Sequence, residues 1–136
     1  MNDSPVIPTL SSQDLAAFQQ TRQMMIDQVV NAILQKGEFQ KIYGDRSREI
    51  VLSGMTFTAR TLEAIMTVSS LDMITQQLIW AKGYLTGQGI SLETILHNFE
   101  LFADVIRETL PPEKYPALTA WMQLLISEQQ KIVSNQ

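Results

Sequence analysis

Apolar residues recur along most of this chain at the three- and four-residue spacing of amphipathic helices. From residue 11 onward, this spacing predicts five main helices and one short helix. No stretch alternates apolar and polar residues for long enough to form a strand. The pattern therefore predicts an all-α protein whose helices share a single core. The expected ranges are about 11–36, 38–43, 47–68, 71–85, 91–109 and 113–133.

Serine residues mark the expected beginnings of several of these helices. Ser11, followed three residues later by Asp14, fits a capping box, in which the hydroxyl accepts an otherwise unpaired backbone N–H. Ser69 and Asp72 have the same spacing and predict the cap of the helix over 71–85. Ser91 is expected to cap the helix that follows.

The helix expected over 47–68 carries an apolar stripe that we expect to be buried. Within this stripe, Gly54 should lower helix stability by about 1 kcal/mol relative to alanine. Close approach of another helix backbone would explain the glycine, and a glycine that is simply tolerated explains it equally well. The stripe consists of Ile50, Gly54, Phe57, Thr61, Ile65 and Val68.

The length of 136 residues is that of one domain. Residues 1–10 contain two prolines and no helical spacing, and they predict a flexible N-terminal tail before a single domain over 11–136. There is no cysteine and only one histidine. These counts exclude disulfides, cysteine-based zinc and iron–sulfur sites, thiol nucleophiles and metal sites with several histidines. We therefore expect no metal and no catalytic residues.

The net charge of −4 argues against nucleic acid as a partner, because binders of nucleic acid normally present a basic surface. The basic residues between positions 36 and 60 alternate with acidic ones and predict a mixed, solvated surface. No apolar window is long enough to cross a membrane, and the N-terminus has no signal-peptide pattern. The expected location is the cytoplasm.

His97 is the only imidazole, and it lies in the helix expected over 91–109, near Glu93 and Glu100. One hypothesis makes it the phosphorylated residue of a histidine phosphotransfer-type bundle, although Glu100 would repel a phosphoryl group. A second makes it a haem ligand. The third, which we favour, is a half-exposed surface histidine paired with a glutamate.

The methionine and aromatic residues are expected first of all in the core, but such side chains also line adaptable apolar pockets. An exposed groove of the same residues would instead suit a helical protein-interaction adaptor. Seven residues of the expected helices are our candidates for lining a ligand pocket. They are Phe57, Thr61, Ile65, Leu78, Phe99, Phe102 and Trp121.

The segment from about Phe39 to Val133 resembles the non-haem globin-like N-terminal domains of stressosome scaffold proteins, the RsbR group. The order of the last four helices and their lengths, about 22, 15, 18 and 20 residues, carry this resemblance. So does the Leu110–Pro112 break before the last helix. The local signal is Trp80-Ala81-Lys82-Gly83-Tyr84-Leu85 followed by Gly89-Ile90-Ser91-Leu92-Glu93.

The resemblance implies a globin-like domain that senses a signal in the stress response, is not an enzyme and forms a homodimer. It implies no haem and no other cofactor, because the helix over 71–85, which would hold the proximal histidine, contains none. Some relatives bind a fatty-acid-like molecule in an apolar interior, so a lipid-like ligand is expected. A signalling partner or output domain is expected as well.

Overall fold

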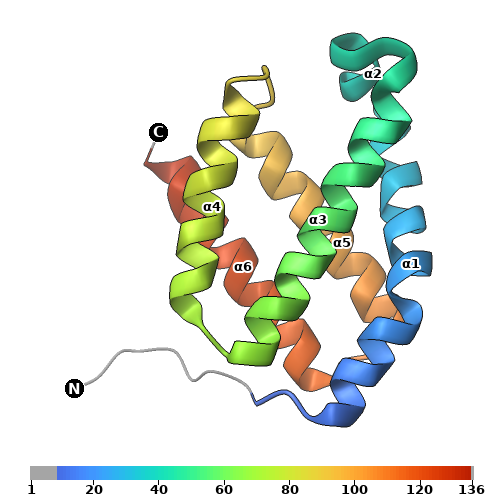
Figure 1. The fold of residues 1–136 in the computed structure, drawn as a ribbon, viewed down its shortest axis with the longest axis vertical. Helices are drawn as coiled ribbons and strands as arrows, with labels where there is room; N and C mark the ends of the chain where they lie inside the picture. The colour runs from blue at the N-terminus through green and yellow to red at the C-terminus, as the bar shows by residue number, and fades with distance from the viewer. Residues whose placement is uncertain (1–8, 136) are drawn as a thin grey trace.

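The computed structural model describes residues 9–135, and every regular element in that range is helical (Figure 1). The all-α class and the five main helices with one short helix are thus confirmed for these residues. Most of the predicted tail lies outside the described residues; Leu10, at its end, is half-buried against the core. The elements are α1 (Ser12–Leu34), α2 (Glu38–Tyr43), the 3-10 turn η1 (Gly44–Arg46), α3 (Ser47–Val68), α4 (Leu71–Thr86), α5 (Leu92–Thr109) and α6 (Pro116–Ser134).

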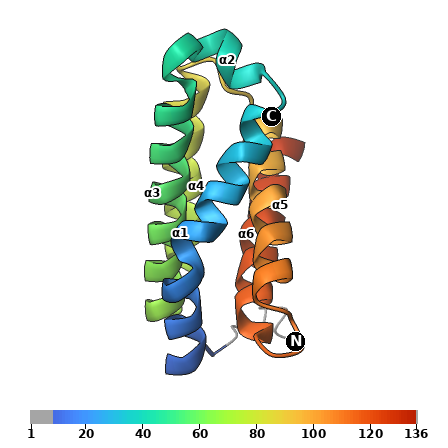
Figure 2. The same cartoon turned by 90° about the vertical axis from the view of Figure 1, so that its right-hand side faces the viewer.

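The five long helices form a ring that is loosest between α3 and α4. Helix α1 packs against α3 and α5, α5 packs against α6, and α6 contacts α4. Figure 1 shows α3 and α4 diverging from the turn that joins them. In Figure 2, α3 and α4 form one layer and α5 and α6 another, and α1 runs obliquely from the first layer to the second.

The core lies where α1, α3, α5 and α6 meet. Its largest members have almost no solvent exposure, and burial of each such side chain contributes roughly 1.5–3 kcal/mol. None of the helices within residues 9–135 combines the length and the apolar character needed to cross a bilayer. The bulkiest buried side chains include Trp121, Phe18, Phe102, Met25, Leu62 and Met122.

Two of the three predicted caps are confirmed. Ser11 Oγ accepts a hydrogen bond from the Asp14 backbone N–H at 3.0 Å, and the Asp14 carboxylate accepts one from the Ser11 N–H at 3.1 Å. Ser91 Oγ accepts from the Thr94 N–H at 3.1 Å. Because these hydrogen bonds are local, the sequence spacing alone was enough to predict them.

The predicted cap of α4 at Ser69 is wrong, because the cap is Ser70. Ser70 Oγ accepts from the Met73 N–H at 3.3 Å. Ser69 instead ends α3 with a φ of 53°, in the left-handed region. That conformation costs about 1–2 kcal/mol for a residue with a side chain. Spacing could not distinguish two adjacent serines, since either can precede a helical first turn.

The predicted buried stripe of α3 is also wrong for all of its members but Ile65. Phe57 is 49% exposed, and Val68 is 58% exposed. The buried face of α3 consists of a neighbouring set of residues, because α1 packs against α3. The apolar residues buried on α3 are Val51, Met55, Ala59, Leu62, Ile65 and Met66.

We expect Ser70→Ala to lower the free energy of unfolding by about 1 kcal/mol, because it removes the hydroxyl that caps α4. Ser69→Gly should leave the stability unchanged or raise it by up to about 1 kcal/mol, because glycine adopts a positive φ without steric cost. Urea unfolding followed by circular dichroism measures both. A larger loss of unfolding free energy for Ser69→Gly than for Ser70→Ala would contradict the assignment of Ser70 as the cap of α4.

Candidate functional site

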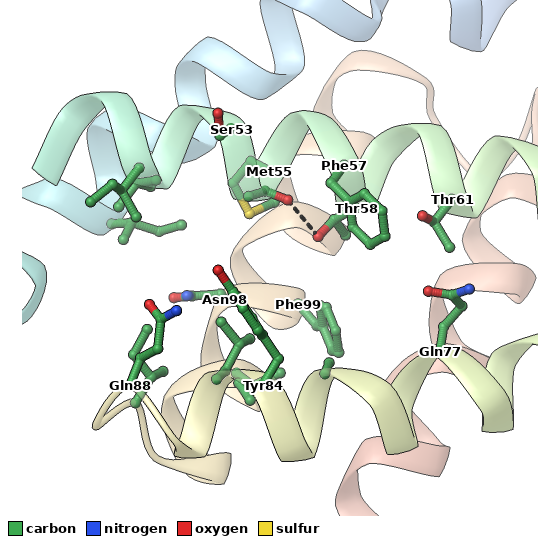
Figure 3. Close-up of a pocket in the computed structure, with 18 of the residues that line it drawn as sticks. Ser53, Met55, Phe57, Thr58, Thr61, Gln77, Tyr84, Gln88, Asn98 and Phe99 are labelled. Atoms are coloured by element: carbon green, nitrogen blue, oxygen red, sulfur yellow. Dashed lines mark hydrogen bonds between the residues drawn. The ribbon is translucent and has the colours of Figure 1, made fainter. Parts of the chain in front are cut away.

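A cavity of about 550 Å³ lies between α3 and α4 (Figure 3). This volume is in the range of small-molecule sites, roughly 300–1,000 Å³. Helices α3 and α4 supply its two walls, and buried apolar side chains of five other segments lie behind them. Those side chains are Ile33 of α1, Phe39 of α2, Ile90 before α5, Ile95 and Phe99 of α5, and Leu125 of α6.

The cavity exists because each wall leaves an apolar face uncovered. On α3, four members of the predicted stripe line the cavity without being buried, and Ile65 both lines it and belongs to the core. The four are Ile50, Gly54, Phe57 and Thr61. On α4, only Ile74 and Leu78 are buried. Leu71, Met73 and Leu85 are only partly buried against the core, and Ile79, Trp80 and Tyr84 are exposed.

Gly54 lies on the α3 wall of the cavity. A Cβ at this position would meet no heavy atom within 4 Å. The explanation of Gly54 by close approach of another helix backbone is therefore wrong, and the glycine is one that the helix tolerates.

Three aromatic side chains form the mouth of the cavity. Phe57 of α3 and Trp80 and Tyr84 of α4 line it, yet they are 49%, 52% and 53% exposed. The Phe57 and Trp80 ring centroids are 5.4 Å apart, so they join the two walls. Trp80 and Tyr84, one helical turn apart, stack with centroids 5.1 Å apart and planes 9° apart. We use the word mouth for these three half-exposed rings of the lining.

Polar groups gather at the end of the cavity near α2. The Tyr43 hydroxyl donates to Gln88 Oε1 at 2.6 Å, which ties α2 to the turn after α4. Desolvation by burial, and next the nearby Tyr84, raise the pKa of Tyr43 above its ordinary value of 10.0, so its phenol is neutral at physiological pH. Asn98 of α5 lies close to Tyr84 in Figure 3.

Polar groups also line other parts of the cavity, among them Ser53 and Thr58 of α3. At the other end, Thr61 of α3 and Gln77 of α4 face each other across the cavity (Figure 3). Its charged lining residues are Arg46 and Glu49 alone, whose Nε and Oε2 atoms are 3.7 Å apart and whose side chains are mostly exposed. The charges of the pair cancel, so the lining carries no net charge.

The structure places five of the seven predicted pocket residues along this cavity, and two away from it. Phe102 and Trp121 do not line it and have 0% exposure in the core. Sequence reasoning missed Trp80 and Tyr84, although apolar residues on more than one face of α4 were a signal for them. The five that line the cavity are Phe57, Thr61, Ile65, Leu78 and Phe99.

His97 is half-buried on α5 and does not line the cavity. We expected a glutamate partner; the partner that the structure shows for its Nε2 is the ammonium group of Lys36, after the end of α1. These two residues are 61 positions apart, so spacing within one helix could not reveal the contact.

Within the part of the chain that the structure describes, no three or more His, Asp or Glu side chains are grouped to hold a metal ion. The chain matches no protein-family model, no curated protein and no solved structure. The function is therefore inferred from the cavity.

Substitution of the two tryptophans should lower the stability of the protein by very different amounts. We expect Trp121→Ala to lower the free energy of unfolding by about 3–5 kcal/mol, since it empties a fully buried site. Trp80→Ala should cost only about 1 kcal/mol, because that ring is half-exposed and loses mainly its contacts with neighbouring rings. Urea unfolding measures both, and Trp121→Phe serves if Trp121→Ala does not fold. Equal losses at the two positions would contradict the placement of Trp121 in the core.

Proposed function

We propose that this chain is a non-enzymatic sensor or regulatory domain that binds an apolar small molecule in the cavity between α3 and α4. The observation that carries the proposal is the cavity itself, with its apolar floor and its three half-exposed aromatic rings. Exposed apolar surface of this kind is characteristic of binding sites. A ligand with a hydrocarbon chain, such as a fatty acid, gains about 0.8 kcal/mol of binding free energy for each methylene group that it buries.

The position of α4 supports a sensing role. This helix forms one wall of the cavity, and it is anchored mainly to α6 rather than to α3. A ligand that contacts both walls binds best at one particular spacing of α3 and α4. Binding would therefore shift the population of α4 positions, and with it the surface that α4 presents to a partner.

The proposal includes the globin-like arrangement and the homodimer that the resemblance to RsbR-group domains implies. The globin-like arrangement is supported by the lengths of α3, α4, α5 and α6, which are 22, 16, 18 and 19 residues. Sedimentation of the purified chain tests the dimer separately from ligand binding. A monomer at every accessible concentration would remove the dimer from the proposal and leave the ligand site in place.

A second candidate function is that of a helical adaptor, and one observation favours it. Ile79 of α4 is 62% exposed and does not line the cavity, so α4 presents an apolar side chain to solvent that a ligand in the cavity would leave uncovered. A docked partner helix would cover Ile79, whereas a ligand inside the cavity would not. Ile79→Gln should therefore weaken partner binding only if the adaptor function is correct.

Filling the cavity should abolish ligand binding. Gly54→Leu projects a side chain from the α3 wall into the cavity without a clash at Cβ. We expect it to fold and to bind decanoic acid, decanol and decanamide at least about tenfold more weakly than the unmodified chain. Titration calorimetry and the fluorescence of Trp80 at the mouth measure the affinity.

Gly83→Leu is the matched control for this experiment. Gly83 is also a helical glycine with nothing within 4 Å of a Cβ, and it lies outside the cavity lining. Both substitutions remove a helical glycine, but only Gly54→Leu should lose ligand. If none of the three compounds binds the unmodified chain, the proposal of an apolar ligand fails.

A further inference from the structure

Polar side chains of the cavity lining lie toward both of its ends, with Gln88 and Asn98 at the α2 end and Thr61 and Gln77 at the other. Gln88, Asn98 and the Tyr84 side chain lie together at one end in Figure 3, while Phe99 lies nearer the middle. Tyr43 is joined to this group by its hydrogen bond to Gln88. A ligand in the cavity would therefore meet polar groups at each end and apolar side chains such as Phe99 between them.

The amides at this end have unused hydrogen-bonding capacity. Gln88 accepts from Tyr43 through its oxygen, and no hydrogen bond within residues 9–135 uses its NH₂ group. Asn98 is half-buried, and its side chain makes no hydrogen bond to any of the described residues. An asparagine amide offers two donors and an acceptor. Solvent reaches both amides, so a ligand group that both donates and accepts can take the place of water at this end.

The charges at this end do not favour an anion. Arg46 and Glu49 are the charged residues of the lining, they pair with each other, and they are mostly exposed to solvent. A carboxylate that entered here would lose hydration without gaining an unpaired cation. A neutral amide loses much less hydration and is matched in both directions by Asn98.

We infer that the ligand carries an uncharged hydrogen-bonding head group of the primary-amide type, held by Asn98 and Gln88 at the α2 end. This inference rests on the proposed function, since it presumes that the cavity binds an amphiphile. The apolar chain of the ligand lies between Phe57 and Leu78 and extends toward Thr61. The site thus selects for the head group at the α2 end and for hydrocarbon along the middle of the cavity.

Affinities for three compounds of equal chain length test the inference. We expect decanamide to bind the unmodified chain at least about tenfold more tightly than decanoate at neutral pH, with decanol in between. Asn98→Leu should weaken decanamide binding about five- to tenfold, the loss expected for a hydrogen bond in a partly buried site. It should change decanol binding less. Titration calorimetry gives each dissociation constant.

Two further variants complete the experiment. Asn135→Leu makes the same substitution at an exposed position outside the cavity and should leave all three affinities unchanged. Gln88→Met removes the second amide from an exposed turn, and it replaces Asn98→Leu if that variant does not fold. It should also weaken decanamide binding selectively.

The outcomes separate this inference from the proposed function. If decanoate binds as tightly as decanamide, or if neither amide substitution weakens decanamide, the head-group inference is overturned while the cavity remains a ligand site. If no compound binds, the proposed function fails, and the inference fails with it.

Discussion

The packing of α1 on one face of α3 is the constraint on which the rest of this structure depends. Helix α1 lies against α3 and α5 and so joins the two layers of the protein. Ala59, with 0% exposure, lies in the middle of the α3 face that α1 covers. Because α1 occupies that face, the second apolar face of α3, which includes Ile50 and Phe57, has no helix on it and lines the cavity.

Helix α4 is held less firmly than the other long helices. It is buried mainly through Ile74 and Leu78, and it contacts α6 more than α3. The Ser70 cap holds its beginning, and the Tyr43–Gln88 hydrogen bond holds the turn after its end. Between these points its wall of the cavity has little apolar packing. Segments with few buried contacts have low local stability, and the elements that move on ligand binding are drawn from them.

The sequence predicted the helical class and most helix boundaries because these depend on local interactions. The capping box at Ser11 involves residues three positions apart, and the α3 range of 47–68 agrees with the structure. The orientation of α3 was not predictable in the same way. Its apolar residues cover two neighbouring faces, and only the position of α1 decides which face is buried.

The candidate site was partly predictable for the same reason. Phe57, Thr61 and Leu78 could be chosen as pocket residues from their helical spacing, but Trp121 and Phe102 have equally suitable spacing and lie in the core. Spacing identifies apolar faces without showing which of them another helix covers. The contact of His97 with Lys36 depends on the placement of α1 beside α5, which no pattern within one helix contains.

A ligand at this site would act on the least constrained part of the fold. Helices α1, α3, α5 and α6 share the main core, so the free energy of binding cannot move them without breaking that core. Moving α4 disturbs fewer buried contacts, and the rings at the mouth already connect it to α3 through Phe57 and Trp80. The same rings are half-exposed, so any change in their spacing also changes the outer surface. Under the proposed function, occupancy of the cavity would be coupled to the surface shape of α4, and the size of that coupling would be limited by how differently the ligand binds the two spacings.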